Sequence, residues 1–374
     1  MCSPQSAVGA FYRREPNPRF IAGTHMFTGG ALDTAIADPD LHWDEATQRW
    51  RLYYQSPHGM TFDPPGAPVL RHATSPDLAA WTFEDTPSLT LPVDGAAWDA
   101  THVTSPSVVY NPDAPPDRRY LMMYSGASGT LPNWPFPAYS IGAAFSADGK
   151  TFTRVPAAQT PKFQDGLVFT GADAYPGSMG AIVADPEVVF FEGTYHLWFS
   201  SFGCSGIDCQ TIDARGIGHA TSADGIFWQL EAAPVPSLLR ASADAASGGA
   251  QPSVVYDALH CRWEMWQTND LVTDTNNQTV ALANMAGVWH ATSMNATSWS
   301  INYNGTRDLV WDEEAAGEGL GLRTGADVAL KGTGRYMVYV GFDDENVPSG
   351  SLLPTQNATT AGVMTLNVAT RDAP

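Results

Sequence analysis

Residues 184–200 read ADPEVVFFEGTYHLWFS, which joins two kinds of strand pattern in one short stretch. An Asp-Pro pair opens a run of β-branched and aromatic residues, and a second run from Tyr195 then alternates aromatic with other side chains. Residues of these types are enriched in strands, and period-2 alternation is typical of strands rather than helices. The stretch therefore predicts two consecutive β-strands, and it is the best of several copies.

Three segment types recur along the chain in a fixed order. Strands that open with X-Pro begin at Asp38, Ser105, Asp185 and Gln251, which are 67, 80 and 66 residues apart. Alternating aromatic strands begin at Trp50, Tyr120, Tyr195, Trp263 and Tyr336. Small-residue strands run into a turn and an aromatic eight residues on, in the pairs Ala73/Trp81, Ala144/Phe152, Ala220/Trp228 and Ala291/Trp299. A degenerate fifth copy starts at Gly325 and closes with residues 362–370.

The repeat predicts an all-β fold, a five-bladed β-propeller with four-stranded antiparallel blades. We expect residues 1–29 to form an N-terminal extension and residues 30–374 to form the propeller, which would be the catalytic domain. High glycine and proline content, 34 and 28 residues, argues against a helical solenoid. No shift in composition interrupts the repeat, which disfavours two domains. The Ser-Ala-Asp-Gly turns before Phe152 and Trp228 are interpreted as structural bends whose aromatic residue packs between blades.

Composition limits the partners. The 374 residues carry 39 acidic and 19 basic side chains, a formal net charge of -20. Such a field repels phosphate, so we expect no nucleic-acid partner and no binding to anionic membranes. No apolar run is long enough for a transmembrane helix, so no membrane insertion is expected. A neutral carbohydrate suits this charge, and we expect a monomer.

The four cysteines allow several interpretations. Cys204 and Cys209 could close a small disulfide, and Cys261 is interpreted as a buried thiol in a strand. Cys2 is either the lipid-anchored cysteine of an exported lipoprotein or an ordinary residue near the start of the chain. We expect a secreted or cell-envelope protein, periplasmic or lipoprotein, of bacterial origin.

Equivalent strand starts should converge on one pocket, because the first strand of each propeller blade lines the central channel. One column of positions holds Asp38, Ser105, Asp185, Gln251 and, less regularly, Gly325. The next column, two residues on, holds Asp40, Ser107, Glu187, Ser253 and Asp327. Clustered carboxylates raise one another's pKa, and a glycosidase needs one ionised and one protonated carboxyl at the same pH.

With these motifs the chain resembles the five-bladed propeller glycoside hydrolases, the clan of family 43 arabinanases, arabinofuranosidases and xylosidases and of the family 32 and 68 fructan enzymes. The closest motif match is to family 43. The resemblance implies that Asp38, in Ala-Asp-Pro, is the general base. It implies that Asp185, in Ala-Asp-Pro-Glu-Val-Val-Phe, raises the pKa of the acid and orients the sugar. The general acid of the family is a Glu that opens the fourth blade, where this chain has Gln251.

An amide cannot donate a proton as a carboxylic acid does, so Gln251 leaves three hypotheses open. Gln251 could replace a native Glu, which would make the chain an inactive form. A neighbouring acid, Glu187 or Glu264, could supply the proton instead. The propeller could also bind sugar without cleaving it.

Candidate substrate-binding residues lie near the strand starts and in one long loop. Trp134, in Leu-Pro-Asn-Trp-Pro-Phe-Pro, is the leading candidate for a sugar-stacking platform, because aromatic faces stack on sugar rings. The other candidates are Asp40, His42, Trp43, Trp98, His102, Ser105 and Asp327. No zinc motif is present, no metal ligands are assigned and no cofactor is expected to be required, although the resemblance allows a Ca²⁺ ion in the channel.

The sequence thus predicts a hydrolase of a furanose- or pentose-containing carbohydrate, of the arabinan, arabinoside or xylan type, with inversion at the anomeric carbon. Inversion would place the two carboxyl groups roughly 6.5–9.5 Å apart. The alternatives are a non-catalytic carbohydrate-binding propeller and a retaining hydrolase or transferase of the fructan type.

Overall fold

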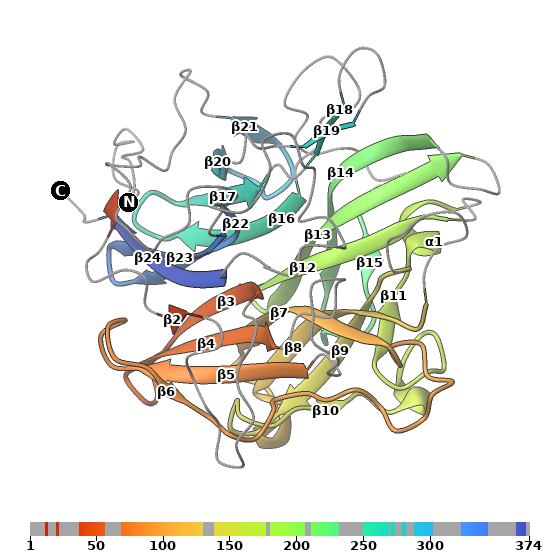
Figure 1. Cartoon of the computed structure of the whole chain (residues 1–374), viewed down its shortest axis with the longest axis horizontal. Helices are drawn as coiled ribbons and strands as arrows, with labels where there is room; N and C mark the ends of the chain where they lie inside the picture. The colour runs from red at the N-terminus through yellow and green to blue at the C-terminus, as the bar shows by residue number, and fades with distance from the viewer. Residues whose placement is uncertain are drawn as a thin grey trace. The chain divides into compact units, whose positions relative to one another are not determined.

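A computed structural model describes most of the chain, and its regular secondary structure is almost entirely β-strand (Figure 1). The described residues are 12–13, 20–21, 37–56, 69–129, 138–176, 180–205, 211–231, 250–268, 271–273, 279–281, 288–301, 323–342 and 364–371. Within them, helix is limited to α1 (Gly171–Ala174) and two single 3₁₀ turns. The prediction of an all-β protein is confirmed.

Five described sheets contain four or more strands, and neighbouring strands in each are antiparallel where their pairing is described. The first sheet has the order β3 (Ala37–Asp44), β4 (Arg49–Ser56), β5 (Val69–Ser75), β6 (Thr82–Phe83). The second has the order β10 (Thr153–Arg154), β9 (Ser140–Ser146), β8 (Tyr120–Ala127), β7 (His102–Tyr110), with β11 (Leu167–Phe169) beside β9. The third has the order β12 (Ile182–Phe191), β13 (Thr194–Ser205), β14 (Thr211–Ser222), β15 (Gln229–Leu230).

The fourth and fifth sheets complete the set. The fourth has the order β16 (Ala250–Asp257), β17 (Arg262–Thr268), β20 (Val288–Ser293), β21 (Trp299–Ile301), and β18 (Leu271–Thr273) pairs with β19 (Thr279–Ala281) in a separate ribbon. The fifth contains β22 (Arg323–Lys331), β23 (Gly334–Phe342) and β24 (Met364–Arg371). These sheets are the blades of a β-propeller, and five of them match the five repeats read from the sequence.

The fifth sheet also takes strands from the other end of the chain. β1 (Tyr12–Arg13) and β2 (Phe20–Ile21) both pair with β24, and Tyr12 lies opposite Thr370. Residues expected to form only an N-terminal extension therefore contribute backbone hydrogen bonds to the last sheet.

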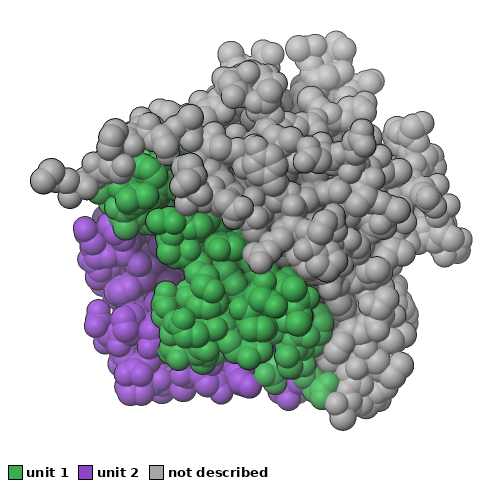
Figure 2. Space-filling model, turned by 90° about the vertical axis from the view of Figure 1, so that its left-hand side faces the viewer, with its two compact units in different colours: residues 1–66, 73–85, 253–374 green, residues 67–72, 86–252 purple. Residues whose placement is uncertain are grey.

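The chain divides into two compact units, coloured separately in Figure 2. Unit 1 contains residues 1–66, 73–85 and 253–374, and unit 2 contains residues 67–72 and 86–252. The core of unit 1 packs the first sheet against the fifth through Trp50, Leu52, Ala329 and Val338. The core of unit 2 packs the second sheet against the third, with Leu121, Ile141, Leu197 and Phe199 at its centre.

The four predicted turns share one hydrogen-bond pattern. In three of them a Ser hydroxyl accepts the N–H groups two and three residues on, and in the fourth Ser293 accepts the N–H of Asn295. In all four an Asp or Asn side chain accepts further N–H groups. The residue three after the Ser adopts positive φ, as Gly149 and Gly225 do. The aromatic that follows packs on a core, for example Trp228 in unit 2 and Trp81 in unit 1. The interpretation of these segments as structural turns is confirmed.

Cys261 differs from its expectation. It forms a disulfide bond, and it lies half-buried in the turn before β17, so the expectation of a buried thiol in a strand is wrong. Cys2 and Cys209 lie outside the described residues, and Cys204 is described only by its place in β13. Among the described residues, no helix is long and apolar enough to cross a membrane.

Candidate active site

Four residues that precede proline at the strand starts have left-handed backbone. Asp38, Ser105, Asp185 and Gln251 have φ of 46°, 46°, 48° and 49°. A following proline disfavours helical conformations, and positive φ is uncommon for residues other than glycine. Each such residue costs on the order of 1–3 kcal/mol and persists only where its surroundings impose it. Repetition of the same strained position in four blades marks these four residues as candidate functional residues.

A β-bulge accompanies the strain. The strand register shifts at this point in β3, β7, β12 and β22, between Ala37 and Asp40 in the first of these. A bulge redirects a side chain and interrupts the ladder. The chain therefore turns Asp38, Ser105 and Asp185 out of the regular strand alternation in three blades.

In unit 2, the bulges of neighbouring sheets are joined by side-chain hydrogen bonds. The Ser105 hydroxyl donates to Asp185 Oδ1 at 3.0 Å. The backbone N–H of Asp185 donates to Ser125 Oγ at 2.9 Å, and the N–H of Gln251 donates to Ser200 Oγ at 2.8 Å. The backbone N–H groups of Asp185 and Gln251 are thus each held by a serine on the second strand of the preceding sheet, Ser125 on β8 and Ser200 on β13. These contacts bring together Ser105 and Asp185, two of the predicted site residues.

The second column is joined in the same way. Glu187, which is buried, accepts the Ser107 hydroxyl at 3.0 Å, and Ser107 Oγ accepts the N–H of Val188 at 3.0 Å. Glu187 is therefore oriented by the second sheet, although it belongs to the third.

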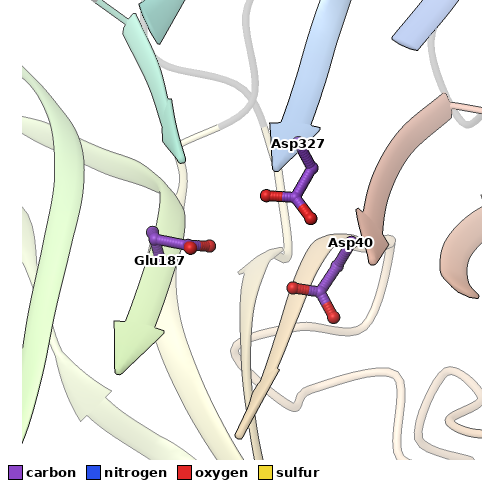
Figure 3. A group of neighbouring side chains, drawn as sticks. All are labelled: Asp40, Glu187 and Asp327. Atoms are coloured by element: carbon purple, nitrogen blue, oxygen red, sulfur yellow. The ribbon is translucent and has the colours of Figure 1, made fainter. Parts of the chain in front are cut away.

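In unit 1, Asp40 and Asp327 lie together (Figure 3). A carboxylate oxygen of Asp40 on β3 is within 4.8 Å of one of Asp327 on β22. Asp327 Oδ2 accepts the N–H of Leu41 at 2.5 Å, and Ser253 also donates to this carboxylate. Burial raises the pKa of Asp327 to about 6, against the opposing effect of these hydrogen bonds. Glu187, the third residue drawn in Figure 3, belongs to unit 2.

The Asp40–Asp327 pair offers the oxygen ligands that a hard cation such as Ca²⁺ prefers. One Asp327 oxygen is already engaged by Leu41. The pair alone supplies fewer than the six to eight oxygens that Ca²⁺ takes, so its donor set is incomplete for that ion. A channel Ca²⁺ remains the expectation stated above.

Glu264, weighed above as an alternative acid, lies in a buried ion network. Arg335 donates to both of its carboxylate oxygens at 2.6 and 2.9 Å, and Arg262 donates at 2.9 and 2.6 Å. Burial by itself would raise the pKa of Glu264, but these guanidinium groups lower it below the usual range. A carboxylate held ionised by two arginines does not serve as a proton donor near neutral pH, so the structure assigns Glu264 a structural role.

Trp43 and His42, two candidate substrate-binding residues on β3, are buried and half-buried. Trp43 packs at 5.0 Å from Trp50, and Lys331 Nζ lies 3.5 Å from the Trp43 ring centroid. With 8% of Trp43 exposed, this ring serves the core of unit 1 and offers no free face to a sugar. Burial lowers the pKa of His42 to about 4, and Arg51 lowers it further while Asp44 opposes the shift. His42 is therefore neutral at physiological pH.

Trp98 and His102 are half-buried near the start of β7. The Trp98 indole N–H donates to the carbonyl of Asp165 at 2.8 Å, and its ring stacks on Tyr124 at 5.8 Å. Only glycine fits at Gly126, because a Cβ there would lie 2.7 Å from the Trp98 ring. His102 Nδ1 is 2.9 Å from the Thr101 hydroxyl, and its ring packs edge-on to Tyr139. Both rings have fixed orientations. Trp134 lies outside the described residues.

Ser125 and Ser200, the acceptors that hold two of the bulges, were not among the residues predicted for the site. A signal was present, because each lies five residues after the aromatic that opens its second strand, Tyr120 or Tyr195. Aligning the repeats at that position would have paired them. The roles given to Asp38, Asp185, Gln251 and the binding residues stay predictions.

The fold is of a kind shared by glycoside hydrolases. No protein-family model and no curated protein sequence matches the chain. Solved structures do match: one is a thermostable family-43 glycoside hydrolase, 15% identical with a TM-score of 0.55, over 91% of this chain and 90% of that one.

Two further solved structures with named activities also match. An α-L-arabinofuranosidase from Lactobacillus brevis is 10% identical, with a TM-score of 0.57, over 94% of this chain and 92% of that one. A family-32 β-fructofuranosidase of Bombyx mori is 15% identical, with a TM-score of 0.57, over 93% of this chain and 62% of that one. At these identities the likeness shows the fold alone.

Proposed function

We propose that the protein acts on a furanose- or pentose-containing carbohydrate as a glycoside hydrolase. The observation that carries this proposal is the strained pre-proline position, which recurs at Asp38, Ser105, Asp185 and Gln251 and presents carboxylates in two of the four blades. Backbone strain of this kind concentrates at active sites and ligand clamps. The fold shared with family-43 and family-32 enzymes supports the same proposal.

In the proposed mechanism Asp38 is the general base that deprotonates a water molecule. Asp185, oriented by Ser105, tunes the proton donor and binds a sugar hydroxyl. The residue at position 251 faces the leaving oxygen, and an acid there would protonate it. Because Gln251 is an amide, the chain as it stands lacks the proton donor in this place, and the remaining candidate is Glu187.

A second function, carbohydrate binding without cleavage, is favoured by Gln251 itself. Every other element of the site would still orient a sugar, because hydrogen bonding to hydroxyls needs no proton transfer. A fructan is the alternative substrate class, since one neighbour is named a β-fructofuranosidase.

A panel of arabinans, xylans and fructans tests these proposals. Each polymer is incubated with the wild-type protein, with Gln251→Glu and with Gln251→Glu/Asp38→Asn, and both released sugar and bound sugar are measured. Hydrolysis by Gln251→Glu that the second change abolishes supports the hydrolase. Binding without release from any variant supports the binding protein, and neither binding nor release contradicts both.

We also propose an exported protein, supported by the disulfide at Cys261, because disulfides persist mainly in oxidising compartments. Thiol labelling of protein taken directly from its native source tests this. Cys261 should be resistant to labelling before reduction, and a freely labelled Cys261 would contradict the proposal.

A further inference from the structure

The second column forms a ladder of hydrogen bonds between neighbouring sheets. In each case the N–H three residues after the strand-start position of one sheet is accepted by the side chain two residues after that position in the preceding sheet. The position is X-Pro in the first four sheets and Gly325-Ala in the fifth. Val188 donates to Ser107 at 3.0 Å, and Val328 donates to Ser253 at 2.9 Å. Leu41 donates to Asp327 at 2.5 Å across a separation of 286 residues.

The link from the fifth sheet to the first is chemically different from the other two. Its acceptor is a carboxylate, whereas the others are hydroxyls, and hydrogen bonds to ionised acceptors are shorter and roughly twice as strong. Asp327 is 6% exposed, and its second partner, Ser253, fixes it from the fourth sheet. The carboxylate therefore bridges three consecutive sheets of unit 1.

Asp327 accepts a hydrogen bond from β3, the strand that contains Asp38. Leu41 lies directly after the β3 bulge, in which Asp38 adopts φ 46° and the register shifts before Asp40. An anchor immediately beyond a strained segment limits the conformations that the segment can relax into. Asp327 was predicted to bind substrate, but its Oδ2 is committed to the backbone of β3.

We propose that Asp327 is a positioning residue that holds the start of β3, and with it Asp38, in the strained geometry of the site. Its effect on turnover rests on the function proposed above, whereas its effect on β3 does not. The two parts are measured separately.

Site-resolved hydrogen exchange tests the grip on β3 in the full-length protein. Asp327→Ala should speed exchange of the Leu41 N–H about tenfold or more and leave Val188 unchanged. The matched variant Ser107→Ala should do the reverse, because it removes the acceptor of Val188 and leaves that of Leu41. Unchanged exchange at Leu41 in Asp327→Ala overturns the proposal.

The conservative variant Asp327→Asn keeps a carbonyl acceptor of the same size, although a neutral one. Exchange at Leu41 should lie between wild type and Asp327→Ala. Should Asp327→Ala fail to fold, Asp327→Asn decides: faster exchange at Leu41 with Val188 unchanged supports the proposal, and rates equal to wild type at both sites overturn it.

Turnover is measured in the Gln251→Glu background. Asp327→Ala should lower kcat about tenfold with KM within threefold, and Asp327→Asn should restore most of kcat. An unchanged kcat, or a loss confined to KM, overturns a positioning role. If Gln251→Glu shows no turnover, the proposed hydrolase fails, while the exchange result still decides whether Asp327 positions β3.

Discussion

The Ser105 hydroxyl on β7 donates to Asp185 Oδ1 on β12, although 80 residues separate the two in the chain. Both residues precede proline, and both have positive φ. A strained residue of one blade thus orients the strained carboxylate of the next. Within unit 2, the strand starts of the second and third sheets are therefore connected by a side-chain hydrogen bond.

Removing the Ser105 hydroxyl should impair turnover more than binding. Hydrogen bonds to charged groups contribute about 1.5–3 kcal/mol, so Ser105→Ala should lower kcat of the Gln251→Glu form about tenfold or more. Steady-state kinetics measure this. Ser298→Ala, at an exposed position, is the matched control and should behave like its parent. Equal kinetics for the two variants would remove Ser105 from the site.

Folding stability should depend on pH through Asp327. Burial raises the pKa of Asp327 to about 6 in the folded protein, so folding favours its protonated form. The contribution is fully present below the unfolded pKa, near 4, and is lost as the pH rises through 6, at a cost on the order of 3 kcal/mol. Urea unfolding of wild type and Asp327→Asn between pH 4 and pH 8 checks this: the variant should lose less stability over that range. Parallel curves would contradict the assignment.

Glycine should be tolerated at a strained position and not elsewhere in the same strand. Gln251 has φ 49°, which glycine adopts without steric cost, so Gln251→Gly should change the free energy of unfolding by less than about 1 kcal/mol. Val254 on the same strand is 2% exposed, and Val254→Gly should cost several kcal/mol. Denaturant unfolding compares them, and similar losses would argue against strain at position 251.

Glu264 should prove structural. Glu264→Gln removes a carboxylate that pairs with the buried guanidinium groups of Arg262 and Arg335, although Arg335 keeps its pair with Asp257, and breaking buried pairs costs about 3–5 kcal/mol. The thermal midpoint should fall accordingly. The pH profile of any turnover that remains should keep its acidic and basic limbs. Loss of the limb that reports the proton donor would instead indicate that Glu264 is that donor.

The sequence predicted the features that repeat. The X-Pro starts, the aromatic second strands and the Ser-Asp-Gly turns each occur several times. An irregular pattern in one copy could therefore be interpreted from the other copies. Asp185 and Glu187 were located because their blade matched the repeat best. Contacts between blades were a different matter: the pairs Ser105–Asp185 and Leu41–Asp327 depend on which strands become neighbours, and no local pattern encodes that.

Single residues outside the repeat were less predictable. Trp43 has the aromatic ring that a sugar-stacking platform requires, but the alternation of side chains along β3 directs this ring to the core, where it contacts Trp50. The oxidation of Cys261 requires a partner sulfur brought close by folding, which spacing alone does not reveal. The short strand Tyr12–Arg13 has no alternation to detect, because two residues cannot display a period.

That short strand has a consequence for synthesis. Tyr12 and Arg13 pair with Thr370 and Ala369, so the fifth sheet takes backbone from both extremes of the chain. A ribosome delivers the first pair long before the second. Tyr12 and Arg13 therefore cannot pair with β24 until β24 has been synthesised. Closing so long a loop carries an entropic cost that no local contact offsets. The fifth sheet can consequently form in full only after β24 has been synthesised. A chain truncated before residue 364 contains β1 but lacks β24, the strand with which β1 pairs.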